Sequence, residues 1–508
     1  STIISIDTGT ILGNPRDANG ILSFKGIPYA APPIGNLRWK SPQAPASFKT
    51  TFNATVYGAS CYASSAAEEP YFTPPSEDCL FLNVWTGATL STEKRPVMVF
   101  LPGGGFQFGS SAQPTYDGSH LATNGVLVVT LNYRLGVFGF LGLTGLDAEG
   151  TSSGNYGLQD QIAALKWVQQ NIASFGGDPT KVTLFGESAG AHAVGMLMTS
   201  SLTNGLFSKA ILESGAFWDS EAGPLATYQQ ARTRGAAFQA SVGASSLAQF
   251  RAMSAVAINA AEQWIPTTDP KISAFSPSID YYVLDLQPGM AFANGLQHRI
   301  PLLAGFNGDE GALFAPYGLS ETNRTKYEDG LQLYFTSRAS QALTLYPDST
   351  SGLLQDSATN LIGDMVIREQ TYTALNCQQA TPGIPANSVF VYYFTYTSPY
   401  SPIAIHTAEL PFVFGNLVPD PVFGPTEGAP TPQDVAFSNA VVSYWTNFAK
   451  TGNPNGIGVP TWPAYTGDGG DFLQLGTSIA AYNYNNTRLQ FIASFRSDGV
   501  LPANWINI

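Results

Sequence analysis

The sequence predicts an α/β protein with a large central, mostly parallel sheet and helices on both faces. Short runs of β-branched or other apolar residues, typical of buried parallel strands, recur at 97–101, 126–130, 209–212, 302–304 and 389–394. Between them, apolar residues at three- and four-residue steps predict an amphipathic helix over 157–173, and the Gly-Gly-Asp-Pro run at 176–179 is expected to turn the chain into the next strand. Alternating strand and helix patterns indicate a single sheet.

Two stretches depart from this alternation and are richer in helix-like patterns, at about 219–300 and about 320–380. We expect them to be helical insertions carried by the sheet. The sequence has no repeat, no low-complexity linker and no sharp change of composition. Residues 1–508 are therefore expected to form one domain.

The most informative motif is Gly186-Glu-Ser188-Ala-Gly190, which lies between an apolar run at 182–185 and a helix-like run at 191–199. G-x-S-x-G between strand and helix is the pattern of a nucleophile elbow, a tight turn that lifts a serine hydroxyl above the end of a sheet. The five residues alone are weak evidence, since an ordinary Gly/Ser turn can match them by chance. The flanking patterns favour Ser188 as a nucleophile that attacks an acyl carbonyl.

A serine nucleophile needs a base within hydrogen-bond reach and an acid that orients the base. The chain has four histidines. In proteins with this elbow, the nucleophilic serine comes first in the sequence, the acid second and the histidine last. His406 lies in a loop past the last core strand and is expected to be the general base. The other three are expected elsewhere: His120 before the serine, His192 in a packing or polar role on the helix after it, and His298 in a surface loop.

The candidate acid and the candidate oxyanion donors each follow a strand-like run. Asp309 and Glu310 come soon after 302–304, and spacing alone does not choose between them as the acid or exclude a plain acidic turn. Gly103-Gly104-Gly105 follows 97–101, where backbone N–H groups, with that of Ala189, could stabilise an oxyanion. A Gly-rich turn is the simpler alternative, and a phosphate loop is not expected because no Lys-Ser/Thr follows.

Composition limits the partners. Of the 508 residues, 44% are hydrophobic, which is enough for a large core, and the net charge is −13 with the acidic excess spread along the chain. No cluster of Lys or Arg indicates nucleic acid or an anionic membrane. No apolar run approaches the roughly 18 residues of a membrane-spanning helix.

Several signals together favour an extracellular protein. The chain opens on Ser1 without a Met or a signal peptide, which fits a processed mature form or a trimmed chain. Three sequons, at Asn53, Asn323 and Asn485, would allow N-glycosylation of a secreted protein. Of the three cysteines, Cys61 and Cys79 flank a short loop-like segment and Cys377 is left over.

An ordered set of motifs over nearly the whole chain resembles the type B carboxylesterase/lipase family, an α/β-hydrolase family that includes cholinesterases and fungal lipases. The motifs lie at 24–29, 37–39, 76–85, 103–106, 132–134, 176–179, 186–190, 309–311, 444–445 and 452–454. So many motifs in order make the resemblance specific, and a secreted fungal carboxylesterase is the nearest type.

The resemblance implies roles that the residues alone leave open. It selects Glu310 as the acid and assigns the oxyanion donors to Gly104, Gly105 and Ala189. It also implies that the Ser214 hydroxyl supports the His–Glu pair, and that Cys61 and Cys79 form a disulfide. The family's second disulfide is missing, so Cys377 is expected to be buried and not reactive.

The loop between Cys61 and Cys79 departs from these relatives. It is short, polar and contains proline, whereas the corresponding loop of fungal lipases is much longer and forms an amphipathic lid. It also lacks the Trp that cholinesterases offer to choline, having only Tyr71 and Phe72. Cholinesterase activity is therefore not expected.

These observations predict a serine hydrolase of carboxylic esters that forms an acyl-enzyme, with no metal or cofactor and a small-molecule ester as its partner. Short- to medium-chain or aromatic esters are expected, and four aromatic residues near the motifs could line the pocket or simply fill the core: Phe106, Phe217, Trp218 and Phe314. The alternatives are a lipase or sterol esterase on long-chain esters, and a catalytically silent adhesion module. We expect a monomer or homodimer. It is not expected to bind nucleic acid or to be an integral membrane protein.

Overall fold

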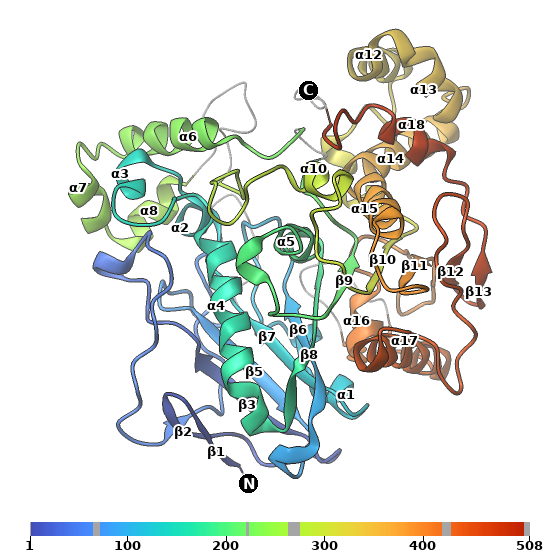
Figure 1. The fold of residues 1–508 in the computed structure, drawn as a ribbon. Helices are drawn as coiled ribbons and strands as arrows, with labels where there is room; N and C mark the ends of the chain where they lie inside the picture. Colours follow the sequence, from blue (N-terminus) through green and yellow to red (C-terminus); the bar gives the residue numbers. More distant parts are fainter. Residues whose placement is uncertain (1, 65–71, 220–222, 263–274, 419–427, 502–508) are drawn as a thin grey trace.

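The computed structural model describes residues 2–64, 72–219, 223–262, 275–418 and 428–501. Its centre is a ten-stranded sheet with the order β13-β12-β11-β10-β9-β8-β6-β7-β5-β3 (Figure 1). All neighbours from β7 to β12 are parallel, while β3, β5 and β13 pair antiparallel at the two ends. The predicted mostly parallel sheet is confirmed.

The strands of the large sheet are β3 (Leu22–Pro28), β5 (Phe81–Thr86), β6 (Arg95–Leu101), β7 (Leu127–Leu131), β8 (Gly177–Glu187), β9 (Lys209–Glu213), β10 (Leu302–Asn307), β11 (Val389–Phe394), β12 (Phe472–Leu475) and β13 (Ile479–Tyr482). A small second sheet is made by β1 (Ile3–Ile6), β2 (Gly9–Leu12) and β4 (Phe52–Asn53).

The longer helices are α4 (Tyr156–Asn171), α5 (Ala189–Leu197), α6 (Tyr228–Ser241), α12 (Arg324–Phe335), α14 (Ser351–Gly363), α15 (Glu369–Ala380) and α17 (Pro432–Thr451). The shorter ones are α1 (Ser119–Ala122), α2 (Gly136–Phe140), α3 (Thr144–Asp147), α7 (Leu247–Ala252), α8 (Ala255–Ala261), α10 (Pro288–Ala293), α11 (Glu310–Phe314), α13 (Ala339–Leu345), α16 (Leu410–Phe414) and α18 (Thr487–Ala493). Among the described residues, none of these helices is both long and apolar enough to cross a membrane.

Alternating side chains of the strands build two cores, one on each face of the sheet. In β6, Val97, Val99 and Leu101 belong to one buried cluster and Met98 and Phe100 to the other. Successive residues of a strand point to opposite faces, so a strand buried on both faces is apolar throughout. Helices α4 and α5 pack on the first cluster and α16 and α17 on the second, which confirms helices on both faces.

One local expectation was wrong. The run at 176–179 is not a turn throughout, because β8 already begins at Gly177, which pairs with Arg95. Only Gly176 turns the chain, with a φ of 86° at the end of the short 3-10 helix η4 (Ile172–Phe175). The register shift between Arg95 and Val97 absorbs the irregular start of β8, so Asp178 and Pro179 fit inside the strand.

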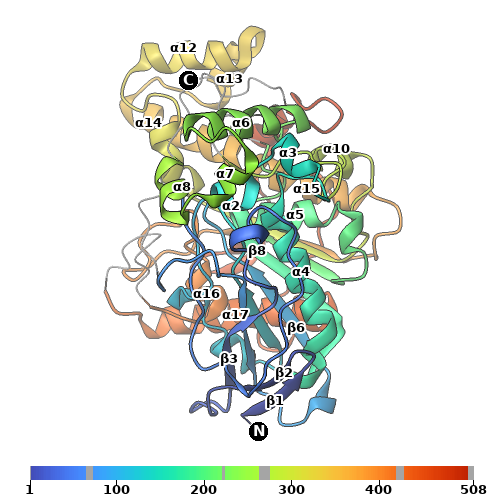
Figure 2. The same cartoon turned by 90° about the vertical axis from the view of Figure 1, so that its left-hand side faces the viewer.

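Both predicted insertions carry helices, and these helices lie at the end of the molecule opposite the N-terminus (Figures 1 and 2). The first stretch contains α6, α7, α8 and α10, and the second contains α12 to α15. Residues 220–222 and 263–274 of the first stretch lie outside the described residues. Tyr327, Leu331 and Phe335 of the second stretch belong to a third buried cluster, which also includes Phe491 and Ile492 of α18.

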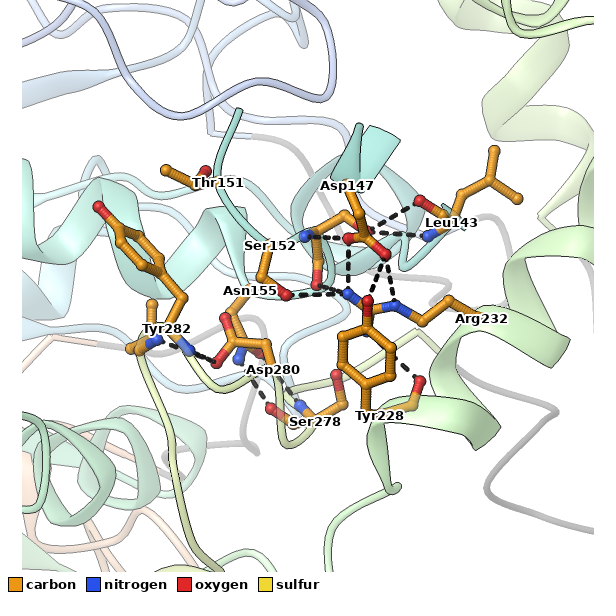
Figure 3. A network of polar contacts seen from close by, with 12 residues as sticks. Leu143, Asp147, Thr151, Ser152, Asn155, Tyr228, Arg232, Ser278, Asp280 and Tyr282 are labelled. Atoms are coloured by element: carbon orange, nitrogen blue, oxygen red, sulfur yellow. Dashed lines mark hydrogen bonds and ion pairs between the residues drawn. The ribbon is translucent and has the colours of Figure 1, made fainter. Parts of the chain in front are cut away.

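A polar network fastens the first stretch to the rest of the fold (Figure 3). The Asp147 carboxylate, at the end of α3, accepts hydrogen bonds from Arg232 Nε at 2.9 Å and Nη2 at 2.7 Å and from Tyr228 Oη at 2.8 Å, all from α6. Nearby, Asn155 and Ser278 exchange two hydrogen bonds of 2.7 and 3.0 Å. These contacts fix the insertion on the loop that precedes α4.

Candidate active site

Ser188 sits on the turn between β8 and α5 in a backbone conformation that L-residues seldom adopt, with a φ of 54° and a ψ of −125°. Its N–H donates to Glu213 O on β9 at 2.9 Å, and its carbonyl accepts from His192 N at 2.9 Å. Its side-chain surface is half-buried, unlike its buried neighbours Glu187 and Ala189. The strained turn therefore leaves this serine within reach of solvent.

The glycines around Ser188 are required by space. A Cβ on Gly190 would lie 1.9 Å from Leu101 O, and one on Gly186 would lie 2.5 Å from the carbonyl carbon of Gly190. A Cβ on Gly103 would lie 2.7 Å from Glu187 O and 3.1 Å from Ser188 Cβ. The G-x-S-x-G motif and the first glycine of 103–105 are therefore parts of one closely packed turn.

His406 and Glu310 lie together behind this turn. His406 Nδ1 is 2.5 Å from Glu310 Oε2, and both side chains are buried. Glu310 Oε1 accepts from Ser214 Oγ at 2.6 Å and from Asn307 N at 2.7 Å. Burial opposes ionisation of Glu310, but His406 and these hydrogen bonds outweigh it and lower the pKa of the carboxyl.

The structure separates the two adjacent carboxyls that sequence spacing left open. Asp309 is exposed and precedes α11, whereas Glu310 is fully buried against His406. The other ring nitrogen, His406 Nε2, lies 3.2 Å from Glu187 Oε1. The hydrogen bonds among the described residues do not include one between Ser188 Oγ and His406, and such bonds often form only once substrate is bound.

The loop at 103–105 follows β6 and has a backbone conformation that favours glycine at two positions. Gly104 and Gly105 have φ values of 114° and 61°, which favour glycine. Tyr133 Oη donates to Pro102 O at 2.7 Å and so fixes the start of the loop. Within the described part of the chain, no hydrogen bond uses the N–H of Gly104, Gly105 or Ala189, so these donors are available to a ligand.

His192 has the polar role expected of it. Its Nδ1 accepts from the N–H groups of Ala216 and Trp218, both at 3.0 Å. Burial and then the nearby His406 lower the pKa of His192 to about 3, so its imidazole is neutral at pH 7. Gln370 Oε1 also accepts from Trp218 N, at 2.9 Å. The backbone beside Ser188 is thus held from two helices.

The four aromatic residues near the motifs divide into two pairs. Phe106 and Phe217 are fully buried. Trp218 and Phe314 are half-buried, with Trp218 in edge contact with Phe106 at 5.1 Å and Phe314 5.1 Å from the His406 ring. A Cβ on Gly105 would lie 3.9 Å from the Trp218 indole. Trp218 and Phe314 are therefore the two that can meet a ligand.

Other predictions have mixed outcomes. The Cys61–Cys79 disulfide is present, with the Cα atoms 5.0 Å apart. Cys377 is half-buried, and burial raises the pKa of its thiol to about 11. His298 lies in a loop, as expected, and is half-buried there with its ring 5.2 Å from that of Phe207. Tyr71 of the short loop lies outside the described residues.

Several residues at the site were missed by sequence reasoning. Glu187 lies inside the G-x-S-x-G motif, directly before Ser188, and this position could have indicated that its side chain lies at the site. Asn307 comes just before Asp309 in the same segment, but its contacts depend on the loop that carries His406. Glu213 and Glu409 are buried acids, and neither belongs to a motif that assigns it a role.

A ten-stranded, mostly parallel sheet with a strained serine turn after a central strand defines an α/β-hydrolase. The model of the carboxylesterase family matches residues 1–492. Para-nitrobenzyl esterase of Bacillus subtilis (strain 168) is 37% identical over 495 residues, covering 95% of this chain and 96% of that protein. Cholinesterase of Mus musculus is 34% identical over 519 residues, covering 94% and 83%.

Solved structures agree with this family. A carboxylesterase of Geobacillus stearothermophilus matches with a TM-score of 0.82 at 32% identity, covering 97% of this chain and 99% of that one. The chain belongs to the carboxylesterase family, and it is a carboxylic-ester hydrolase.

Proposed function

We propose that this hydrolase acts through an acyl-enzyme in which Ser188 is the nucleophile, His406 the general base and Glu310 the acid that orients the base. The observation that carries the proposal is the buried contact of 2.5 Å between His406 Nδ1 and Glu310 Oε2. An ionised carboxylate on Nδ1 holds the proton there and leaves Nε2 as the base. The strained turn of Ser188 presents the only hydroxyl of the G-x-S-x-G motif.

In this mechanism His406 takes the proton of Ser188 as the hydroxyl attacks the ester carbonyl, and returns it to the leaving alcohol. Water then repeats the sequence and releases the acid. The N–H groups of Gly104, Gly105 and Ala189 stabilise the oxyanion in both halves, and each such donor typically contributes about 3 kcal/mol. No step requires a metal or cofactor.

The substrates that we propose are short- to medium-chain or aromatic esters. The half-buried indole of Trp218 stands beside Gly105, where the carbonyl oxygen of the ester would sit, so this indole is the side chain that we propose limits the length of the acyl chain. Phe314, beside His406, offers an aromatic surface to the substrate. The names of the relatives refer to different esters, so the substrate class is proposed from these residues.

We also propose that the protein is extracellular and glycosylated. The side chains of the three sequon asparagines, Asn53, Asn323 and Asn485, are exposed. The disulfide between Cys61 and Cys79 fits an oxidising compartment.

The test is kcat/KM on p-nitrophenyl esters from acetyl to palmitoyl, for the wild type and Ser188→Ala. We expect a maximum at short or medium chains that disappears in the variant. A maximum at long chains would contradict the substrate class and favour a lipase. Turnover that survives in Ser188→Ala would contradict the assigned nucleophile, and no turnover on any member would contradict esterase action on this class.

A further inference from the structure

Four fully buried glutamates lie in this part of the fold: Glu187, Glu213, Glu310 and Glu409. Two of them face the imidazole of His406 directly, Glu310 at Nδ1 and Glu187 at Nε2. The mechanism above uses neither Glu213 nor Glu409. Buried carboxyls are costly unless they are neutralised or paired, so this second pair needs an explanation.

The carboxyls of Glu213 and Glu409 interact with each other, and one oxygen of each, Glu213 Oε2 and Glu409 Oε1, is buried with no other hydrogen-bond partner among the described residues. A carboxyl can donate to a second carboxyl only if one of them carries a proton. Each also has one N–H donor of its own: Trp445 Nε1 donates to Glu213 Oε1 at 2.8 Å, and Asn307 Nδ2 donates to Glu409 Oε2 at 2.5 Å. Burial, and next the charge of Glu409, hold the pKa of Glu213 well above its usual range, while burial raises the pKa of Glu409 to about 7.

The pair is joined to the proposed acid and base through Asn307. The Asn307 side chain also donates to Ile405 O at 2.9 Å, directly before His406, and its backbone N–H donates to Glu310 Oε1 at 2.7 Å. One residue thus contacts the acid, the loop of the base, and Glu409. If Glu409 moved, the Asn307 side chain would lose one of its two hydrogen bonds.

Glu213 is joined to the same residues from the other side. Its carbonyl accepts the Ser188 N–H at 2.9 Å, and the next residue, Ser214, donates to Glu310 Oε1 at 2.6 Å. The two donors to this oxygen, Ser214 Oγ and Asn307 N, therefore come from two chain segments, the ends of β9 and β10. A hydrogen bond between Glu213 and Glu409 would link these two segments through the Asn307 side chain and close a ring of contacts around Glu310.

Other groups near the pair can influence its proton. The charge of Glu310, on α11, raises the pKa of Glu409, and that of His406 lowers it. Tyr392, on β11, has a buried hydroxyl whose pKa is raised well above its usual value by burial and then by Glu409, Glu213, Glu310 and Glu187. Trp445, on α17, contributes only a neutral donor.

We propose that Glu213 and Glu409 are positioning residues that share one proton, and that their hydrogen bond, together with Asn307, keeps Glu310 and His406 in the geometry that catalysis needs. This inference rests on the proposed roles of Glu310 and His406. When alkali removes the shared proton, two carboxylates face each other in a buried site. Their repulsion would separate the two segments and misplace the donors to Glu310, so activity should fall on the alkaline side.

The test compares Glu213→Gln with Glu213→Leu, measuring kcat, KM and the pH profile on the same ester. The amide of Glu213→Gln can still donate to Glu409 and accept from Trp445, but it has no proton to lose. We expect its kcat at neutral pH to stay within about twofold of the wild type and its alkaline decline to be weaker. The leucine side chain can do neither, and we expect kcat to fall by up to about 10²-fold with little change in KM.

Glu262→Gln is the matched control. Glu262 is also buried, and burial raises its pKa to about 8, but its carboxyl accepts from Val137 N and has no recorded contact with Glu310 or His406 within the described chain. We expect this variant to keep the alkaline decline of the wild type. If Glu262→Gln removed that decline, or if Glu213→Leu kept the wild-type kcat and pH profile, the proposal would be overturned.

Infrared difference spectra provide a readout that does not depend on folding of the leucine variant or on turnover. A buried protonated carboxyl gives a C=O band at neutral pH, and we expect Glu213→Gln to remove the band of the shared proton. Glu262, whose pKa is raised to about 8 by burial, gives a separate band, and Glu262→Gln should remove that band only. A spectrum of Glu213→Gln that keeps every carboxyl band of the wild type would refute the shared proton. Ser188→Ala separates the two proposals, because it abolishes activity if the triad is right and leaves the band of the shared proton in place.

Discussion

Asp309 and Glu310 are neighbours in the sequence, yet only Glu310 faces His406. The difference arises because α11 begins at Glu310 and directs it inward, where Ser214 and Asn307 hold it, while Asp309 remains at the surface. At the scale of single residues, this pair allows a direct comparison of a buried and an exposed carboxyl, since each can be changed to its amide with little change in size.

We expect Glu310→Gln to lower kcat by about 10³- to 10⁴-fold, because an amide cannot stabilise the imidazolium that forms during attack. Asp309→Asn should change kcat by no more than about twofold, as is usual for exposed positions. Both values come from steady-state kinetics on one p-nitrophenyl ester. Equal losses in the two variants would contradict the assignment of Glu310.

Trp218 is the residue on which the proposed preference for short acyl groups depends. We expect Trp218→Ala to raise the ratio of kcat/KM for decanoyl over acetyl esters by about tenfold or more, since each added methylene in an apolar pocket is worth about 1 kcal/mol or more. Trp218→Phe should shift the ratio much less, because a ring remains beside Gly105. An unchanged ratio in the alanine variant would show that the acyl chain lies elsewhere.

At the scale of elements, the contact between α3 and α6 provides the clearest test of what holds the first insertion. Arg232 and Asp147 form an ion pair of 2.7 Å whose side chains are 4% and 16% exposed. Burial opposes ionisation of Asp147, but the bonds from Arg232, Ser153 and Tyr228 outweigh it and lower its pKa. Its charge therefore stabilises the fold at neutral pH, and this contribution is lost as the pH falls below its ordinary value of 3.8.

We expect Asp147→Asn to lower the free energy of unfolding by about 3 kcal/mol at neutral pH, because Arg232 would be left buried without its partner. The difference from the wild type should shrink below about pH 4. Urea unfolding at the two pH values measures both effects. Glu149→Gln is the control: its pair with Arg251 has the same form but is 30% exposed at the glutamate, so it should cost less than about 1 kcal/mol.

The elements themselves were predictable to different degrees. The strand at 389–394 was found to the residue because an unbroken apolar run can only be buried on both faces. The helix expected at 157–173 is α4 (Tyr156–Asn171) followed by η4. The spacing of apolar residues predicts which face of the helix is buried, but it does not predict where the α-helix ends. The start of β8 was missed because its pairing with β6 depends on a register shift that local sequence does not reveal.

At the scale of the whole molecule, the residues of the site also differ in how far the sequence predicts them. Some belong to sequence motifs, and others are brought to the site only by packing. The proposed roles of Ser188 and His406 could be inferred from the sequence because a strained turn and a late loop leave a local signature and the chain has only four histidines. The choice of Glu310 over Asp309 needed the family resemblance. Glu213 and Glu409 could not be found, because what makes them important is the burial that only the packed strands and α16 create.

The whole molecule also carries the last prediction, which concerns N-glycosylation. Asn53 and Asn485 each accept a hydrogen bond from the Thr of their own sequon, at 2.8 and 2.7 Å. Asn323 is different, because its Oδ1 caps α12 by accepting from Lys326 N at 3.0 Å. A glycan on its Nδ2 would leave that bond intact, whereas replacing the asparagine would cost about 1 kcal/mol in helix stability.

We therefore expect secretion from a glycosylating host to yield a protein with three N-glycans, and Thr325→Ala to remove one of them while leaving the cap and the melting temperature of the deglycosylated protein unchanged. Asn323→Gln should remove the same glycan but also lower that melting temperature. Intact-mass measurement before and after glycosidase treatment counts the glycans, and calorimetry compares the two variants. An unmodified protein from such a host would contradict the proposed glycosylation, and equal melting temperatures would contradict the capping role of Asn323.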